Sequence, residues 1–235
     1  MNVGGYTGSG AVVSGQQTAR NHTTGDNIIY IGRNAGANAP ATGSQNCIVI
    51  GGAAAIAAAV DTSIIMGHGA VSLSATVTNS IILGRYAQYG GGTISGSVLV
   101  GNDSMFRATG GGGNNNTTLG YQTGYSIEGT GNTFVGYRAG YRSSNTNVNS
   151  AVCIGNLAGF GLVNSSDLYI GNSNAISAHL IWGNFASQTL KLRSNHLEFV
   201  DLPQAANDAA AASAGVAVGE YYLATGDNKL TRRAA

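Results

Sequence analysis

The stretch NSIILGRYA, residues 79–87, holds three bulky aliphatic residues between a polar pair and a glycine. A small residue, Ala87, follows three places after that glycine. Variants of the phrase recur along most of the chain, for example NIIYIGRNA around Gly32 and GNTFVGYRA around Gly136. Because a nearly constant repeat length is typical of stacked repeat architectures, this recurrence predicts a solenoid.

Ten glycines anchor the repeats, at intervals of 16 to 19 residues. A weaker echo, HLIWGNF around Gly183, follows after only 12 residues and indicates the atypical unit expected at the end of a repeat array. The ten anchoring glycines are Gly15, Gly32, Gly51, Gly67, Gly84, Gly101, Gly120, Gly136, Gly155 and Gly171.

The residues directly before each glycine are mostly β-branched or aromatic, which predicts short strands. The glycine density and the absence of a 3.6-residue period exclude helices from the repeats. Glycine permits the bend that ends each strand, and the Asn, Ser, Thr, Gly or Asp residues before the strand are turn formers. The sequence therefore predicts an all-β fold, a parallel β-roll or β-helix solenoid of about ten coils.

Both faces of these strands are apolar. Residues one and three places before the glycine point to one side, and the residue two places before it points to the other. In a lone solenoid this second position would face water, yet its occupants, such as Tyr30 and Ile82, are mostly apolar. Since one face fills the coil, the other requires a partner. We expect self-association about a common axis as a homotrimer, although the spacing does not distinguish three subunits from two.

Aromatic residues form a second ladder, five places after the glycine, and five consecutive repeats contribute a ring. In a parallel stack these rings lie over one another, which predicts a buried or half-buried structural spine. The alternative is a strip of exposed rings that stacks on sugars. Tyr86, Tyr121 and Tyr137, one or two places after their glycines, are the better candidates for ligand binding. The five rings belong to Tyr89, Phe106, Tyr125, Tyr141 and Phe160.

The composition excludes several classes of protein. Only 9% of the residues are charged and the net charge is +1, whereas a nucleic-acid partner requires a basic face. The start MNVGGYTGSG carries neither the basic segment nor the apolar core of a signal peptide. The apolar run at residues 53–60 is shorter than the about 20 residues that span a bilayer. We therefore expect no nucleic-acid partner and no membrane insertion.

No catalytic or metal-binding pattern is present. The four histidines lack zinc-site spacing, and no G-x-S-x-G motif occurs. Carboxylates are too sparse to supply the close pair of a glycosidase. Cys47 and Cys153 lie about six coils apart, roughly 28 Å at ~4.7 Å per coil, which is too far for a disulfide, so both are expected to be apolar fillers. We expect a protein that is not an enzyme and needs no cofactor or metal.

The chain divides into three parts. Residues 1–14 form an N-terminal peptide that could serve attachment, residues 15–186 form the solenoid, and residues 187–235 form a C-terminal module. Charged residues are denser in this last part, and the repeat stops. The module is expected to contain strands, a short helix and a hairpin.

Local signals place the helix and the hairpin of the C-terminal module. The helix is expected in NDAAAASAG, capped by Asn207 or Asp208 and ended by Gly215. The hairpin is expected to turn at residues 226–228.

The repeats resemble those of two known families. NSIILGRYA resembles the head repeat of trimeric autotransporter adhesins, in which an Asn-Ser pair, an aliphatic stretch, Ile-Gly and a small residue recur. NNTTLGYQTGY and GNTFVGYRAGY resemble the glycine-tyrosine repeats of bacteriophage tail fibres. The resemblance covers roughly residues 10–186 and implies a trimeric parallel β-roll.

The resemblance implies a structural virion fibre on the tail or the capsid, at the particle surface. Its expected partners are two further copies, other virion proteins, and a host-surface glycan or protein bound through the inter-coil loops 37–46 and 105–115. One alternative is the passenger head of a bacterial trimeric adhesin, which the absent signal peptide and membrane anchor disfavour. A glycan-hydrolysing tailspike and an ice-binding solenoid are further alternatives. The last needs a longer threonine array than Thr117, Thr118 and Thr133 provide.

Overall fold

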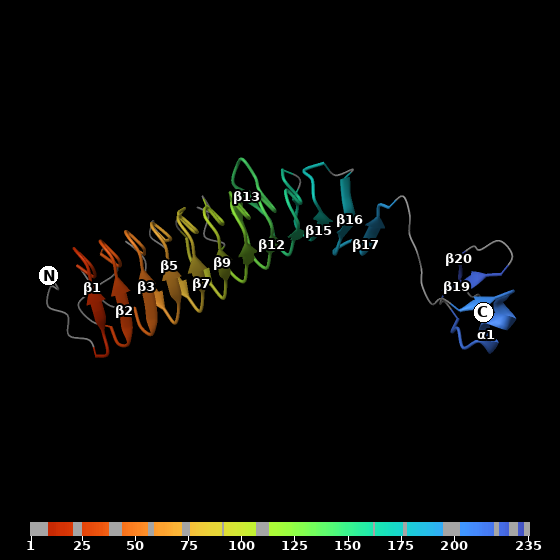
Figure 1. The fold of residues 1–235 in the computed structure, drawn as a ribbon, viewed down its shortest axis with the longest axis horizontal. Helices are drawn as coiled ribbons and strands as arrows, with labels where there is room; N and C mark the ends of the chain where they lie inside the picture. The colour runs from red at the N-terminus through yellow and green to blue at the C-terminus, as the bar shows by residue number, and fades with distance from the viewer. Residues whose placement is uncertain are drawn as a thin grey trace. The chain divides into compact units, whose positions relative to one another are not determined.

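The chain folds into two compact units, Met1–Arg193 and Ser194–Ala235 (Figure 1). The first is a parallel β-solenoid, and the second is a small unit with three strands and one helix among its described residues. The computed structural model describes residues 9–20, 25–37, 44–55, 59–71, 76–90, 92–106, 113–161, 163–175, 178–194, 203–218, 221–225 and 230–232.

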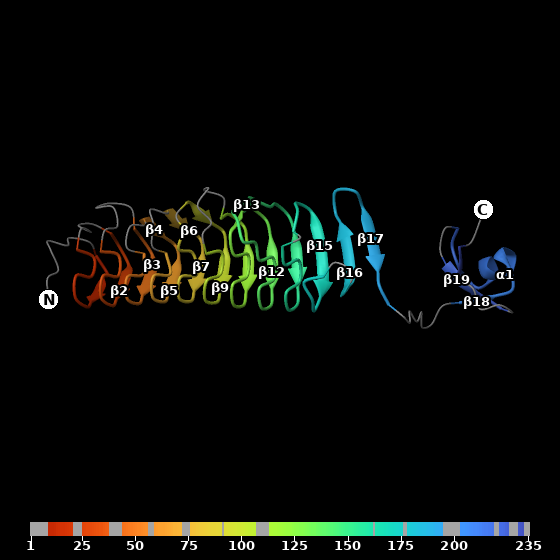
Figure 2. The same cartoon turned by 90° about the horizontal axis from the view of Figure 1, so that it is seen from above.

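The predicted parallel β-solenoid is confirmed. Each of the ten repeats contributes one strand to a single long sheet, and the described residues close about eight turns, where the sequence analysis expected about ten coils (Figures 1 and 2). The ten strands are β1 (Val12–Ser14), β2 (Ile28–Ile31), β3 (Cys47–Ile50), β5 (Ile64–Met66), β7 (Ile81–Leu83), β9 (Val98–Val100), β10 (Thr117–Leu119), β12 (Thr133–Val135), β14 (Val152–Ile154) and β15 (Asp167–Gly171).

Equivalent repeat positions lie over one another in this sheet. Ile82 of β7, for example, pairs with Ile65 of β5 on one side and Leu99 of β9 on the other. The leg before the strand forms smaller parallel sheets in some coils, so the stacking includes it. These are β4 (Ala59–Asp61), β6 (Thr76–Thr78) and β8 (Ile94–Ser95) in one sheet, and β11 (Ile127–Glu128) and β13 (Thr146–Asn147) in another.

The polar pair at the start of the repeat phrase builds the first corner of the coil. Asn79 adopts the left-handed conformation with φ +50°, which asparagine tolerates better than most residues. The next residue, Ser80, is buried and donates its hydroxyl to the Thr78 carbonyl at 2.7 Å. Its backbone N–H donates to the Ser63 hydroxyl, and its own hydroxyl accepts from the Ser97 N–H at 3.1 Å. The corners of adjacent coils are thereby joined by side chains.

This ladder of buried polar side chains continues along the solenoid. The Asn116 N–H donates to the Ser97 hydroxyl, and the Asn132 N–H donates to the Asn116 side-chain oxygen at 2.9 Å. The Asn132 oxygen in turn accepts from the Ala151 N–H at 3.0 Å. Serine and asparagine can both occupy the position because either supplies an acceptor for the next coil.

The inner and outer strand faces are the reverse of the expected assignment. Residues two places before the glycine fill the coil: Tyr30, Ile82 and Phe134 are fully buried. The reason is the period of two along a strand, which puts Ile82 on the same side as the inward Ser80. Ile81 and Leu83 therefore point outward. The conclusion that both faces are apolar stands, but the uncovered face is the one with two aliphatic positions per strand.

The anchoring glycine forms the second corner. Gly32 has φ +127°, in a region that only glycine occupies readily, and a Cβ on it would lie 2.5 Å from the Gly51 carbonyl oxygen of the next coil. The anchoring glycines from Gly15 to Gly155 all have φ between +119° and +143°. The recurring glycine thus serves both the bend and the close stacking of coils.

The sheet changes direction at the end of the array. β16 (His179–Asn184) pairs antiparallel with β15, and β17 (Thr189–Leu192) pairs antiparallel with β16. The echo at Gly183 therefore marks an atypical terminal unit. Thr189–Leu192 belongs to the solenoid sheet, although the sequence analysis placed it in the C-terminal module.

The second unit contains β18 (Gln204–Ala205), α1 (Asp208–Ser213), β19 (Tyr221–Ala224) and β20 (Leu230–Arg232). Asn207, one of the two expected caps, is the N-cap of α1, and its side chain accepts from the Ala210 N–H at 2.9 Å. The expected turn at residues 226–228 lies outside the described residues. No described helix has the length and hydrophobicity needed to cross a membrane.

We predict that Gly32→Ala destabilises the solenoid by about 3 kcal/mol, because it adds backbone strain of ~1–3 kcal/mol and drives the next coil away. Gly161→Ala is the control, since Gly161 also has positive φ but nothing lies within 4 Å of its added Cβ. It should lose only about 1 kcal/mol. Guanidinium unfolding followed by circular dichroism measures both, and equal losses would contradict the stacking role.

Candidate functional site: the outer sheet face and the aromatic ridge

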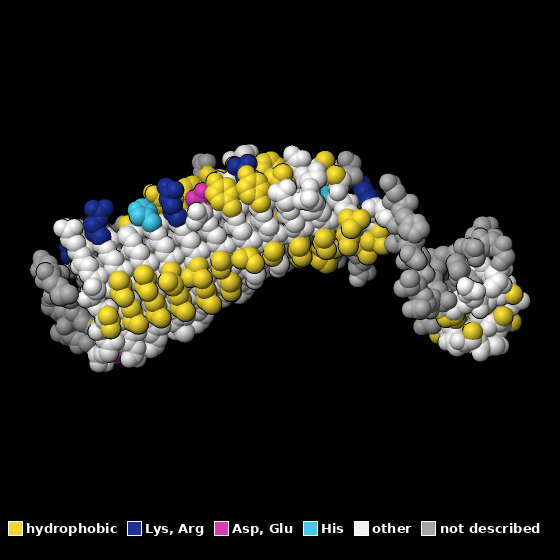
Figure 3. All heavy atoms as spheres, in the orientation of Figure 1, with side chains coloured by type: hydrophobic (Ala, Val, Ile, Leu, Met, Phe, Trp, Pro, Cys, Tyr) yellow, Lys and Arg dark blue, Asp and Glu magenta, His cyan; other side chains and the backbone are white. Residues whose placement is uncertain are grey.

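The outward face of the solenoid sheet carries a long band of mostly aliphatic side chains, in which Ser14, Thr117 and Thr133 are the polar positions (Figure 3). Several are well exposed, including Met66 at 41%, Ile81 at 39% and Leu119 at 52%. We call this surface the outer apolar band, and it contains no charged residue. Its members are Val12, Ser14, Ile29, Ile31, Ile48, Ile50, Ile64, Met66, Ile81, Leu83, Val98, Val100, Thr117, Leu119, Thr133, Val135, Val152, Ile154, Leu168 and Ile170.

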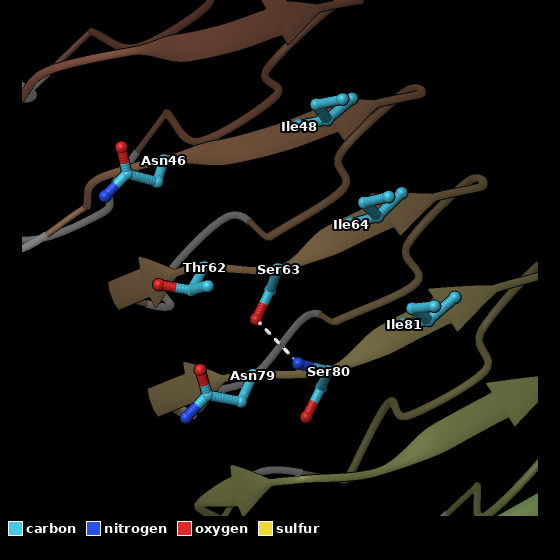
Figure 4. A pocket seen from close by; sticks show the side chains of 8 residues that line it. All are labelled: Asn46, Ile48, Thr62, Ser63, Ile64, Asn79, Ser80 and Ile81. Carbon is cyan, nitrogen blue, oxygen red and sulfur yellow. Dashed lines mark hydrogen bonds between the residues drawn. The ribbon is translucent and has the colours of Figure 1, made fainter.

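A groove of about 540 Å³ runs along one edge of the band, where the corner residues meet the strands (Figure 4). One wall is a column of isoleucines, and the other is a column of short polar side chains from the left-handed corners. The residues lining it are Asn46, Ile48, Thr62, Ser63, Ile64, Asn79, Ser80 and Ile81. A surface of alternating ridges and hollows of this kind can interlock with another regular surface.

A second hollow, of about 330 Å³, lies at the end of the band near the β16–β17 turn. Leu168 and Leu190 line it, and Gly183 lies between them in the strand register. Phe185, exposed at 52%, also lines it. The apolar character of the outer face therefore extends onto the terminal hairpin.

The aromatic ladder forms a continuous stack, which we call the aromatic ridge. Adjacent ring centroids are 4.8 to 5.3 Å apart and adjacent planes differ by 5° to 22°. All five rings are half-buried, so the expected structural spine is confirmed. Because each inner ring is covered on both faces by its neighbours, the ridge offers ring edges rather than ring faces. Its members are Tyr89, Phe106, Tyr125, Tyr141 and Phe160.

The three candidate ligand-binding tyrosines lie between the band and the ridge. Tyr121 and Tyr137 are exposed at 41% and 46% and stack on each other with centroids 5.6 Å apart. Tyr86 is half-buried and packs edge-on against Tyr89 at 5.1 Å and His68 at 5.5 Å. The structure thus brings two of the three together, and ligand binding by them stays a prediction.

Polar side chains surround these rings, and no sequence motif distinguishes them. The Arg85 guanidinium lies 4.7 Å from the Tyr86 ring centroid, and that of Arg138 lies 5.3 Å from the Tyr137 centroid. The Arg138 Nε donates to the Gln122 side-chain oxygen at 2.7 Å. These residues stand one or two places after their glycines, where side chains point out of the coil. That repeat position is the feature of the sequence from which the network could have been found.

Chemically reactive groups are buried or dispersed. Cys47 and Cys153 are both buried, with no disulfide between them. His179 is buried and its Nε2 accepts from the Gly159 N–H at 3.2 Å, whereas His22 and His196 lie outside the described residues. In the described ranges, no three His, Cys, Asp or Glu side chains are grouped to hold a metal ion.

The expected ligand-binding loops 37–46 and 105–115 lie mostly outside the described residues. No protein family, curated protein or solved structure was found to match this chain. A function can therefore be inferred only from the described surfaces of this chain, above all from the outer apolar band.

The thiols provide a test of the core. Burial raises the pKa of Cys47 to about 11 and raises that of Cys153 as well. Since the thiolate is the reactive form, neither thiol should react with a thiol reagent at pH 8 in the native protein, while both should react in guanidinium. Because the folded pKa of Cys47 exceeds its ordinary value of 9.0, its contribution to stability is complete below pH 9 and is lost as pH rises through about 11.

The exposed position in Asn156→Cys provides the control, because a thiol there should react rapidly in the native protein. Rapid modification of Cys47 or Cys153 without unfolding would contradict their placement inside the coil.

Proposed function

We propose that this chain is a structural fibre protein of a bacteriophage particle, which assembles as a homotrimer and mediates attachment to the host surface. The observation that carries the proposal is the outer apolar band. Contiguous exposed apolar patches beyond a few hundred Å² are rare on soluble monomers and mark interaction surfaces. The band crosses ten parallel strands and has no charged residue to keep it hydrated.

The occupant that fits the band best is another copy of the same chain. The band repeats its columns at the spacing of stacked coils, so a matching partner needs the same spacing over the same length. A second solenoid of this sequence has both.

The assignment to a virion rests on the resemblance of the repeats to phage fibres and trimeric adhesin heads. A solenoid that exposes an aromatic ridge away from its self-association surface suits an attachment fibre. In this arrangement the trimer buries the bands, while the side bearing the ridge is available to a host glycan or protein.

We predict that the wild-type chain sediments as a trimer at micromolar concentration, while Ile81→Asp dissociates it. A charge buried in the band would cost roughly 3 kcal/mol or more, equivalent to over about a hundredfold in dissociation constant. Asn147→Asp, exposed, outside the band and in the leg that precedes β14, is the matched control and should leave the trimer intact. Analytical ultracentrifugation, with circular dichroism to verify folding, measures this. A wild-type monomer would contradict the proposal.

We also predict that purified particles of the phage whose genome encodes this chain carry it on their surface. Mass spectrometry of density-banded virions should detect it, and antibodies against the solenoid should label the particles in electron micrographs and slow their adsorption to host cells. Antibodies against the C-terminal unit serve as a second probe. Absence of the chain from the particles would remove the virion assignment, whatever its oligomeric state.

A further inference from the structure

Charged side chains are segregated around the outer apolar band. In the described part of the ten repeats, arginines lie in the leg that follows the glycine corner, as in Arg33, Arg85 and Arg138. Three carboxylates lie in the opposite leg, before the strand: Asp26, Asp61 and Glu128. A carboxylate outside this pattern, Asp103, belongs to the polar network of Arg138, because it accepts from Gln122 at 3.5 Å. Asp167, at the strand start, is buried.

The two legs flank the band on opposite sides. The acidic leg leads into the left-handed corner, the strand follows, and the basic leg begins directly after the glycine corner. Figure 3 shows lysine and arginine side chains gathered along one side of the band. Asp26 and Arg33 lie beyond the two ends of β2, whose four residues alone span about 13 Å at ~3.3 Å per residue. That distance is too long for an ion pair within one chain.

Opposite charges also stand at matching heights of the stack. Asp26 and Arg33 lie on either side of β2, and Glu128 and Arg138 lie on either side of β12. Asp61 precedes β5, whereas Arg85 follows the neighbouring strand β7. Two of the three pairs of opposite charges therefore lie within a single coil, and the third pair spans two adjacent coils.

We propose that the copies are related by an axis parallel to the stack, at equal height, with the basic side of each band against the acidic side of the next copy. This inference rests on the self-association proposed above and adds its direction, its register and the residues that select them. Rotation about such an axis preserves height and always brings one flank of a copy against the opposite flank of its neighbour.

The competing arrangement is an antiparallel pair with a two-fold axis perpendicular to the stack. It would place basic flank against basic flank and acidic against acidic, at mismatched heights. Exposed ion pairs add little affinity, but like charges brought together disfavour a wrong arrangement. The apolar band thus provides the attraction, and the flanking charges select the orientation.

Charge reversal tests the pairing of Arg33 with Asp26 of a neighbouring copy. Arg33→Glu should raise the trimer dissociation constant about tenfold at low salt, and Asp26→Arg should do the same. The double variant Arg33→Glu/Asp26→Arg should restore assembly, because the pair is only inverted. In 1 M salt, where the Debye length is about 3 Å, the single variants should approach wild type. Trimers indifferent to both reversals would overturn the proposal.

Cross-linking tests the direction without altering charge. Asn147 and Asn156 are exposed and lie before and after β14, on opposite flanks of one coil. The variant Asn147→Cys/Asn156→Cys, treated with a short bismaleimide, should give a covalent trimer on a denaturing gel, while either single variant should not. Wild type is a control, because its two thiols are buried.

The outcomes separate the two proposals. A wild-type chain that is monomeric removes the proposed trimer and this inference with it. A trimer that gives no cross-linked species in the double variant, or only dimers, overturns the parallel in-register arrangement and leaves the trimer itself in place.

Discussion

The structure depends on how tightly one coil can stack on the next. At the glycine corners from Gly15 to Gly155, the Cα of one coil lies against the carbonyl of its neighbour, as at Gly32 and Gly51, where a Cβ would sit 2.5 Å from that oxygen. At the other corner, Ser80 and its equivalents pass hydrogen bonds from coil to coil inside the solenoid. From β5 to β12 the strands are joined to their neighbours at both ends in this way. Equivalent side chains therefore form columns, and each column gives one surface of the solenoid its chemical character.

Columns explain the surfaces that carry the proposed function. A single outward isoleucine is common on protein surfaces. Ile48, Ile64 and Ile81, however, lie above one another and form one wall of a groove. The same rule turns isolated tyrosines and phenylalanines into the aromatic ridge. In the described repeats it also places the arginines on one flank and Asp26, Asp61 and Glu128 on the other, because the leg after the glycine and the leg before the strand each repeat along the stack.

The repeat phrase was sufficient to predict the strands, the glycine corners, the parallel stacking and the aromatic spine, because each follows from the residue types at a fixed period. The inward and outward faces were assigned wrongly, since hydrophobicity is similar on both sides and only the inward Ser80 distinguishes them. The antiparallel pairing of Thr189–Leu192 was also missed, because it breaks the period. The Arg138–Gln122–Asp103 network joins residues from separate coils, so only the stacked register reveals it.

The central claim is that the outer apolar band is covered in solution by further copies of the chain. Methionine oxidation tests it most directly, because Met66 lies in the band at 41% exposure while Met105 is fully buried inside the coil. Treated with dilute peroxide and followed by mass spectrometry, Met66 is predicted to oxidise nearly as slowly as Met105 in the folded protein at micromolar concentration. Rapid oxidation of Met66 alone, at the rate of an exposed methionine, would show an uncovered band and contradict the account.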